Sequence, residues 1–238
     1  MDRLYFKQLL SGRDFATSDA LAHQMVNFCY LIGDRDTGEA AVIDPAYGAQ
    51  DLIDILAADG MHLTAMLATH YHPDHVGGSM MGHSIEGVRE LLEAGVEAKV
   101  HCQHQEAAGI RHVTSISESD IIEHSSGDVV QVGAIPIQLL HTPGHTPGSQ
   151  CFVVDGKLVS GDTLFLDGCG RTDLPGGDPD QLYDSVHSRL AQLPGETVLY
   201  PGHLYSPESS AALSEVRDRN YVFRFKTREQ WMARFGDN

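Results

Sequence analysis

The segment Thr69-His70-Tyr71-His72-Pro73-Asp74-His75 gives the strongest structural signal in the chain. It directly follows residues 64–68, an apolar run that predicts a buried strand. Its closely spaced His and Asp residues do not fit one face of a strand, whereas a loop leaving the strand's carboxyl end wraps them around one point. Such loops are where α/β folds bind ligands. The segment therefore predicts a metal-binding loop, with a solvated polar loop as the alternative.

Three later turns repeat this arrangement of a predicted strand, a turn containing Gly or Pro, and a single His or Asp. They are His145 in 142–148 after strand 135–140, Asp162 in 160–163 after strand 157–159, and His203 in 200–203 after strand 197–200. Imidazoles with a carboxylate suit Zn(II), Fe(II) or Mn(II). The absence of Cys from this set argues against a closed structural zinc site. The four turns together predict one metal centre.

The rest of the chain predicts two β-rich halves, each with helices. The first half contains strands 26–32, 40–43 and 99–102 and helices 50–58, 85–94 and 105–110; the second contains strands 129–132 and 150–154 and helices 179–191 and 207–220. This order favours an α/β fold of two sheets packed face to face and covered outside by helices. No repeat, low-complexity tract or linker interrupts it. We therefore expect one domain, 1–238, with a short helical and basic tail from about 207 to 238.

The pattern HxHxDH, followed by a lone His, a lone Asp and a last His, resembles the metallo-β-lactamase superfamily from about residue 26 to 203. The resemblance implies an αββα sandwich of two mixed sheets with a one- or two-metal site along one edge. The ligands it implies are His70, His72 and His145 for the first metal and Asp74, His75 and His203 for the second, with Asp162 bridging. Asp44 matches an early Asp that supports the site without binding metal. We expect two divalent ions, Zn with Fe or Mn as alternatives.

A second resemblance lies in 166–178, whose Gly-Arg-Thr-Asp core occupies 170–173. The stretch resembles the equivalent loop of the glyoxalase II (hydroxyacylglutathione hydrolase) group and of the related persulfide dioxygenases. Both groups act on glutathione adducts. The loop therefore indicates this branch of the superfamily and does not distinguish the hydrolases from the dioxygenases. Arg171 is a candidate substrate contact. We favour the alternative that Arg171 pairs with Asp173 to hold a Gly-rich loop.

The tail concentrates basic residues, since six of the chain's 16 Lys and Arg fall in the last 24 positions. Tyr205, Arg217 and Arg219 are candidates to bind a small anionic substrate such as glutathione, whose carboxylates Arg contacts in a forked geometry. The alternative, which we favour, is a solvated helix face with a tail docked by its aromatic residues and Trp231.

The resemblance to the glyoxalase II group implies, as the leading hypothesis, a metal-dependent thioester hydrolase. A metal-bridging hydroxide would attack an S-acyl glutathione or a similar acyl thioester, with Asp74 as ligand and as candidate catalytic residue. The alternative is an Fe(II) glutathione persulfide dioxygenase, in which His70, His145 and Asp162 hold one iron. A third possibility is a non-catalytic metal-binding protein, against which the intact ligand set argues.

Composition excludes several other classes. The formal net charge of −17 repels phosphate backbones and anionic lipid, so neither nucleic acid nor a membrane surface is an expected partner. No apolar run is long enough to span a membrane, and the N-terminus lacks a signal-peptide pattern. Four widely spaced cysteines suit reduced thiols, so we expect a cytoplasmic protein. A homo-oligomer is left open, as are roles for the other nine of 14 histidines, including His101 and His104.

Overall fold

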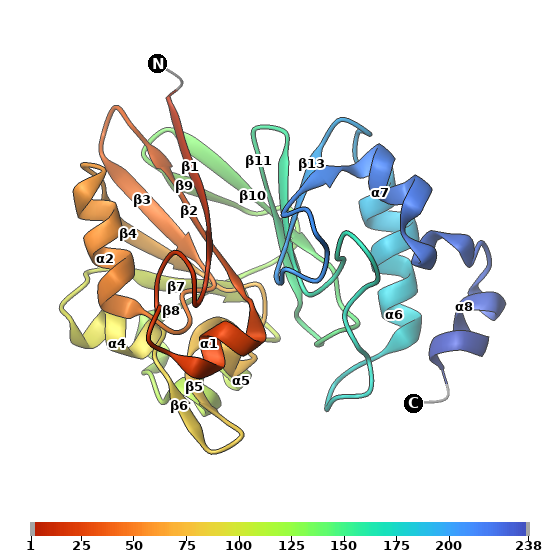
Figure 1. The fold of residues 1–238 in the computed structure, drawn as a ribbon, viewed down its shortest axis with the longest axis horizontal. Helices are drawn as coiled ribbons and strands as arrows, with labels where there is room; N and C mark the ends of the chain where they lie inside the picture. The colour runs from red at the N-terminus through yellow and green to blue at the C-terminus, as the bar shows by residue number, and fades with distance from the viewer. Residues whose placement is uncertain (1–2, 237–238) are drawn as a thin grey trace.

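Two six-stranded sheets pack face to face with helices on both outer faces, as Figure 1 shows. The computed structural model describes residues 3–236. The strand order is β1-β2-β3-β4-β7-β8 in the first sheet and β14-β13-β12-β11-β10-β9 in the second. The layers confirm the αββα sandwich predicted from the sequence, because each sheet buries one face against the other sheet and one against helices.

The first sheet is built from the N-terminal half of the chain. Its strands are β1 (Leu4–Leu10), β2 (Phe28–Asp34), β3 (Glu39–Ile43), β4 (His62–Leu67), β7 (Lys99–Gln103) and β8 (Ile121–His124). β1, β2 and β3 pair antiparallel, and β3, β4, β7 and β8 pair parallel. The parallel strands bring the carboxyl ends of β3 and β4 to one edge of the sandwich. Asp44 and the loop of residues 69–75 start at that edge.

The second sheet is mainly antiparallel. Its strands are β9 (Val129–Val132), β10 (Ile135–His141), β11 (Gln150–Val154), β12 (Lys157–Gly161), β13 (Val198–Pro201) and β14 (Ala211–Ala212). Only β12 and β13 pair parallel, so the turns after them leave the sheet side by side. A separate two-stranded hairpin, β5 (Gly78–Met80) with β6 (His83–Ile85), projects beyond the sheets at the lower end of Figure 1.

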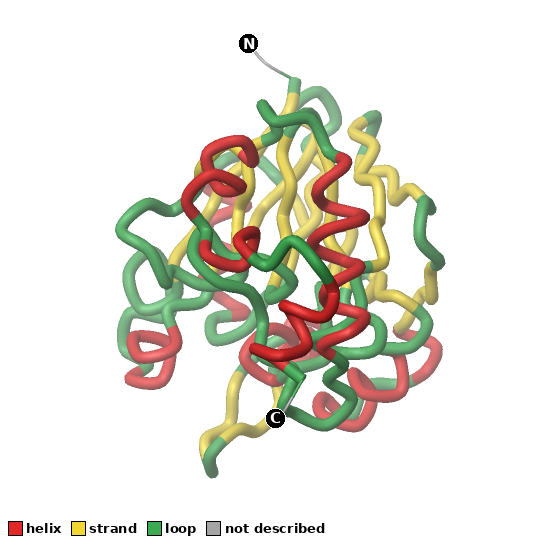
Figure 2. Tube along the Cα trace, turned by 90° about the vertical axis from the view of Figure 1, so that its right-hand side faces the viewer, coloured by secondary structure: helices red, strands yellow, loops and turns green. Residues whose placement is uncertain are grey.

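Helices cover the two outer faces. They are α1 (Ala20–Met25), α2 (Ala49–Ala58), α3 (Pro73–Val76), α4 (Val88–Glu93), α5 (Ala107–Thr114), α6 (Pro179–Asp184), α7 (Leu213–Arg219) and α8 (Arg228–Phe235). In Figure 1, α2 and α4 flank the first sheet, and α6 and α7 flank the second. Figure 2 is turned so that the side of α6 and α7 faces the viewer, and it shows helices in front of the strands.

Strand β2 illustrates why both faces of each sheet are apolar. Phe28, Tyr30 and Ile32 enter the core between the sheets, whereas Cys29 and Leu31 enter the core beneath the helices. Successive side chains of a strand point to opposite faces, so a strand buried on both sides is continuously apolar. All seven residues of β2 are accordingly buried.

The C-terminal segment packs against the helices of the second sheet. Trp231 in α8 is fully buried, and its indole Nε1 donates a hydrogen bond to the carbonyl oxygen of Pro179 at 2.8 Å. The ring of Tyr183 lies edge-on to Trp231 at 5.7 Å. The last two positions of the predicted tail, 237 and 238, lie outside the described residues.

Several element boundaries differ from the sequence prediction. The predicted helix 85–94 is β6 followed by α4, because Gly87 packs against the backbone of Val76 and begins the helix there. The predicted helix 207–220 begins only at Leu213, after the short strand β14. The predicted helix 179–191 is α6 followed by a π-helical segment, Ser185–Arg189. Strands β1, β5, β6, β8 and β14 and helices α1 and α3 were not predicted. All but the seven-residue β1 are short elements, whose formation tertiary contacts decide.

Within residues 3–236, no helix has both the length and the apolar character needed to cross a bilayer. All four cysteines are free thiols, and Cys29, Cys102 and Cys151 are buried.

Candidate metal centre

Four strand ends meet at the edge where the sequence predicts the centre. Gln150, at the start of β11, joins the two sheets there: its backbone N–H and its Nε2 donate to the carbonyl oxygens of Thr69 and Ala68, both at 2.9 Å. The turns after β12 and β13 are joined by a hydrogen bond from Gly202 N to Gly161 O at 2.8 Å. A Cβ at Gly202 would lie 2.3 Å from Asp162 Oδ1, so only glycine permits this approach.

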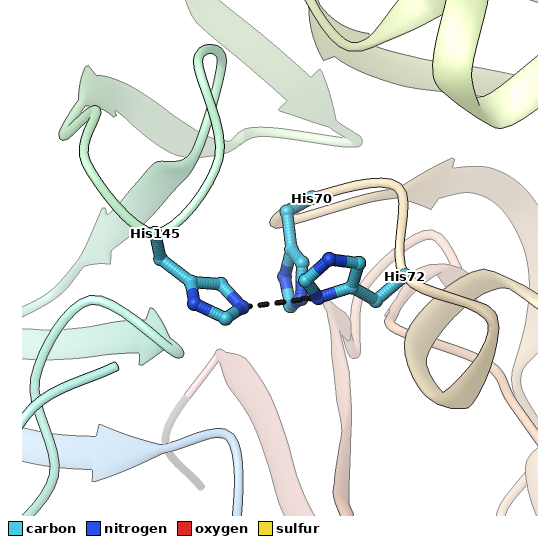
Figure 3. Close-up of side chains that lie close together, drawn as sticks. All are labelled: His70, His72 and His145. Carbon is cyan, nitrogen blue, oxygen red and sulfur yellow. Dashed lines mark hydrogen bonds between the residues drawn. The ribbon is translucent and has the colours of Figure 1, made fainter. Parts of the chain in front are cut away.

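Three histidines form the first group of candidate metal ligands, shown in Figure 3 and called the first ligand group below. Nδ1 of His72 lies 3.0 Å from Nε2 of His70 and 3.0 Å from Nε2 of His145. Two nitrogens bound tetrahedrally to one metal at ordinary bond lengths lie about 3.3 Å apart. The spacing of the three nitrogens therefore fits a single ion.

A second ligand group contains Asp74, His75 and His203. Nε2 of His75 lies 3.3 Å from Nε2 of His203, and Oδ2 of Asp74 lies 3.6 and 3.5 Å from these two atoms. All three residues are buried. The spacing again fits one ion, so the structure brings together both sets of residues that the sequence predicts as ligands.

Asp162 lies between the two groups. Its Oδ1 is 3.4 Å from Nε2 of His75, and its Oδ2 is 3.4 Å from Nε2 of His203 and 3.8 Å from Nε2 of His145. Oδ1 is also buried without a hydrogen-bond partner. A buried, unpartnered carboxylate oxygen is costly unless it faces a cation, so this atom fits a metal ligand.

Oxygen atoms behind the histidines fix the orientation of four rings. In each ring Nδ1 lies 2.8–3.0 Å from an oxygen atom. His70 faces Thr69 Oγ1 and His75 faces Asp44 Oδ2. His145 faces the carbonyl oxygen of Arg171, and His203 faces that of Met25. With Nδ1 donating, each Nε2 presents a lone pair to the centre. This arrangement is the usual support for metal-binding histidines.

Asp44 lies behind the ligands, where the resemblance places it, and does not reach the ligand atoms. Besides His75, its carboxylate accepts the backbone N–H of Thr69 at 2.8 Å and the Thr69 hydroxyl at 2.6 Å. Its backbone has φ +54°, a left-handed conformation that is uncommon outside glycine. Local strain of this kind persists where surrounding contacts hold the residue in place.

The electrostatics favour positive charge at the centre. Burial alone lowers the pKa of His75, but Asp162, Asp74 and Asp44 outweigh burial and raise that pKa to about 10. Burial opposes ionisation of Asp162, yet His203 and His75 hold the pKa of its carboxyl well below the usual range. Three carboxylates around one buried imidazole form a donor set that a divalent cation neutralises.

Asn27 is a residue of the centre that the sequence analysis missed. Its Nδ2 donates to Asp74 Oδ2 at 3.2 Å and lies 3.4 and 3.5 Å from Nε2 of His75 and His203. Its Oδ1 is buried without a hydrogen-bond partner. Residue 27 forms a bridge with His203 through the backbone. No local motif marks this Asn, because it precedes β2 and reaches the centre only through the tertiary arrangement of the strands.

A cavity of about 530 Å³ opens onto both ligand groups. Its walls are largely apolar, and they include Met25, Met80, Met81, Phe165, Leu174 and Tyr221. The ring of Tyr205 stacks on His203 at 4.7 Å between centroids and is half exposed at the mouth. The cavity therefore suits a ligand with an apolar portion next to the metal ligands.

Among the predicted substrate-binding residues, Arg171 and Tyr205 line the cavity. Arg171 also pairs with Asp173, with Nε to Oδ1 at 2.6 Å, as the alternative interpretation of the loop requires. The structure places Arg217 and Arg219 elsewhere. Arg217 donates to the carbonyl oxygens of Leu190 and Leu193, and Arg219 pairs with Glu208. Neither arginine lines the cavity, because α7 packs on the outer face of the second sheet.

The histidines outside the predicted ligand set lie apart from the centre. His101 Nδ1 contacts His124 Nε2 at 2.8 Å beside a different cavity, and His104 is exposed. In the described part of the chain, every group of three clustered candidate ligands belongs to the centre formed by residues 70–75, 145, 162 and 203.

Fold and site together define a metal-dependent enzyme of the αββα type, with its centre at one edge of the sandwich. The chain belongs to the metallo-beta-lactamase superfamily, whose family model matches residues 24–203. Human mitochondrial persulfide dioxygenase ETHE1 is 30% identical over 225 residues, which cover 90% of this chain and 80% of that protein.

Two further relatives come from the two enzyme groups that the loop 166–178 resembles, one from each. The hydroxyacylglutathione hydrolase of Methylobacillus flagellatus is 37% identical over 187 residues, covering 78% of this chain and 65% of that protein. The crystal structure of ETHE1 from Myxococcus xanthus matches with a TM-score of 0.77 and 30% identity, covering 98% of this chain and 90% of that chain.

Proposed function

We propose that this protein is an iron-dependent dioxygenase that oxidises the persulfide of a glutathione-type thiol. From the sequence, this reaction ranks second, after thioester hydrolysis. The comparisons support the reverse order. The likeness to the two ETHE1 proteins extends over nearly the whole of this chain and over most of the length of each ETHE1 chain. The hydroxyacylglutathione hydrolase is matched over a smaller share of its own length.

The structural observation that carries the proposal is the position of Asn27. Its amide Nδ2 lies within 3.5 Å of all three ligand atoms of the second group. The amide has only two N–H groups for these three atoms, and one of them donates to Asp74 Oδ2 where a second cation would otherwise lie. This favours one metal at the centre over two.

As the resemblance to the dioxygenases implies, the residues that would hold this metal are His70, His145 and Asp162, and His72 would lie beside the ion without binding it. Two histidines and one carboxylate with open positions are typical of non-haem Fe(II) oxygenases, and iron bound there would supply the redox chemistry with O₂. Arg171 O and Thr69 Oγ1 orient the two imidazoles. The apolar cavity wall suits the sulfur of the substrate, and Arg171, whose guanidinium pairs with Asp173, also lines the cavity.

Thioester hydrolysis is the second candidate, and one observation favours it. Both ligand groups are complete, and Asp162 faces each of them. A pair of metals held in this way would activate water and polarise a thioester carbonyl.

One preparation separates the two candidates. The purified chain is analysed for bound metal, and aliquots reconstituted with Fe(II) or Zn(II) are assayed for O₂ uptake with glutathione persulfide and for hydrolysis of S-lactoylglutathione. We expect about one iron per chain and O₂ uptake. About two metals with hydrolysis and no O₂ uptake would overturn the proposal and favour the second candidate. Neither activity would overturn both and favour a non-catalytic metal-binding protein.

A further inference from the structure

Glu106 is a buried carboxylate that the sequence analysis did not single out. It lies at the N-terminal end of α5, and none of its surface is exposed. Its Oε2 accepts the backbone N–H of Tyr71 at 2.7 Å. Its Oε1 accepts the backbone N–H of Gly148 at 2.7 Å and the hydroxyl of Thr146 at 2.9 Å. One carboxylate thus connects two segments that are far apart in sequence.

Both segments carry ligands of the first group. Tyr71 lies between His70 and His72, and Thr146 directly follows His145. The segments leave strands of different sheets, β4 and β10, so no shared β-ladder fixes their relative position. The hydrogen bonds of Gln150 join the strand ends, and Glu106 joins the loops that follow.

We propose that Glu106 positions the first metal-binding group by holding the loop of His70 and His72 against the loop of His145. It is a positioning residue, because it neither belongs to a ligand group nor lines the cavity. The proposal concerns the assembly of the ligands and does not depend on which reaction the centre performs.

The chemistry of the three contacts explains why this residue is a glutamate. All three partners are donors, and an ionised carboxylate is the one common side chain that only accepts. A glutamine would turn an NH₂ group toward at least one of these donors. Burial raises the pKa of Glu106, while the hydrogen bonds from Thr146, Gly148 and Tyr71 oppose that rise.

Close packing around Glu106 leaves the loops little freedom to move. A Cβ at Gly148 would lie 2.6 Å from Gln103 Oε1, and a Cβ at Gly109 would lie 2.6 Å from Cγ of Tyr71. Both glycines therefore permit a close approach that larger residues prevent. The Tyr71 hydroxyl also donates to Pro175 O at 3.1 Å, which extends the connection to the loop 166–178.

The test compares Glu106→Gln with a matched control, Asp34→Asn. Asp34 is also a fully buried carboxylate that accepts backbone N–H groups, from Ala134 at 2.7 Å and Asp36 at 3.0 Å. It lies beside the turn before β10, whereas His145 follows the other end of that strand. Each metal-free variant is titrated with Zn(II) against a chelator, its Co(II) absorption spectrum is recorded, and its thermal unfolding is measured.

We expect Glu106→Gln to bind metal about 10–100-fold more weakly and to alter the Co(II) spectrum, because a misplaced loop changes the ligand geometry. Asp34→Asn should lower thermal stability and leave metal affinity and spectrum unchanged. Unchanged affinity in Glu106→Gln would overturn the proposal. An equal loss in Asp34→Asn would also overturn it, since general destabilisation would then explain both results.

A second variant keeps the proposal testable if Glu106→Gln fails to fold. Thr146→Val retains the shape of the side chain but removes one of the three donors to Glu106. We expect weaker Zn(II) binding than in the unmodified chain. The loss of affinity should be less than about 10–100-fold, because the donors from Tyr71 and Gly148 remain. Metal affinity equal to that of the unmodified chain would overturn the proposal.

Discussion

Nδ1 of His75 lies 2.9 Å from Oδ2 of Asp44, and the same carboxylate oxygen accepts the hydroxyl of Thr69 at 2.6 Å. Asp44 therefore orients one imidazole of the second group directly and that of His70, in the first group, through Thr69. A single carboxylate at the end of β3 thus acts on both ligand groups.

Replacing Asp44 with Asn should weaken metal binding by about 10–100-fold, because the amide turns a donor toward Thr69 or His75. Asn tolerates the left-handed backbone of this position, so the loss reports on the hydrogen bonds. Chelator competition measures it. Asp155→Asn is the control, since Asp155 also has a positive φ, of +45°, and lies in the turn between β11 and β12. Equal losses in both variants would contradict the assignment.

Replacing Asn27 with Ala should raise the metal content toward about two per chain, because the donor that serves the second group is removed. Elemental analysis after dialysis against Zn(II) gives the stoichiometry, and circular dichroism verifies the fold. The backbone bridge between residues 27 and 203 does not depend on the side chain. A fall in metal content would show instead that the amide helps to hold an ion.

Asp162→Ala should abolish metal-dependent activity and reduce metal content, because the carboxylate between the two groups is lost. His104→Ala should leave both unchanged, since His104 is exposed and belongs to none of the ligand groups. O₂ uptake, thioester hydrolysis and elemental analysis on the two variants give the comparison. Loss of activity in His104→Ala with retention in Asp162→Ala would refute the ligand assignment.

Arg217→Met should lower stability and leave the Michaelis constant unchanged, because this guanidinium contacts the carbonyls of Leu190 and Leu193. The expected loss is about 1.5–3 kcal/mol, the range for a hydrogen bond to a charged group. Arg171→Met, at the rim of the cavity, should raise the Michaelis constant instead. Denaturant unfolding and steady-state kinetics distinguish the two. A raised Michaelis constant in Arg217→Met would restore the tail as a substrate site.

The sequence patterns predicted the layers of the fold, and the resemblance to the metallo-β-lactamase superfamily implied the candidate ligands of both groups. Ligands such as His70 and Asp162 follow strands whose apolar pattern is local, and turns rich in Gly and Pro mark the ends of those strands. Local patterns are visible in sequence because they depend on neighbours a few positions apart. The superfamily follows from the same spacing.

The tertiary structure decided what lies around those ligands. Asn27 and Glu106 have no distinguishing neighbours in sequence, and they reach the centre because distant strands and helices place them there. The same holds for Arg217, whose charge predicted substrate binding but whose helix packs on the outer face. A hydrogen bond between residues far apart in the chain exists only after folding brings donor and acceptor within about 3 Å, so no local pattern encodes it.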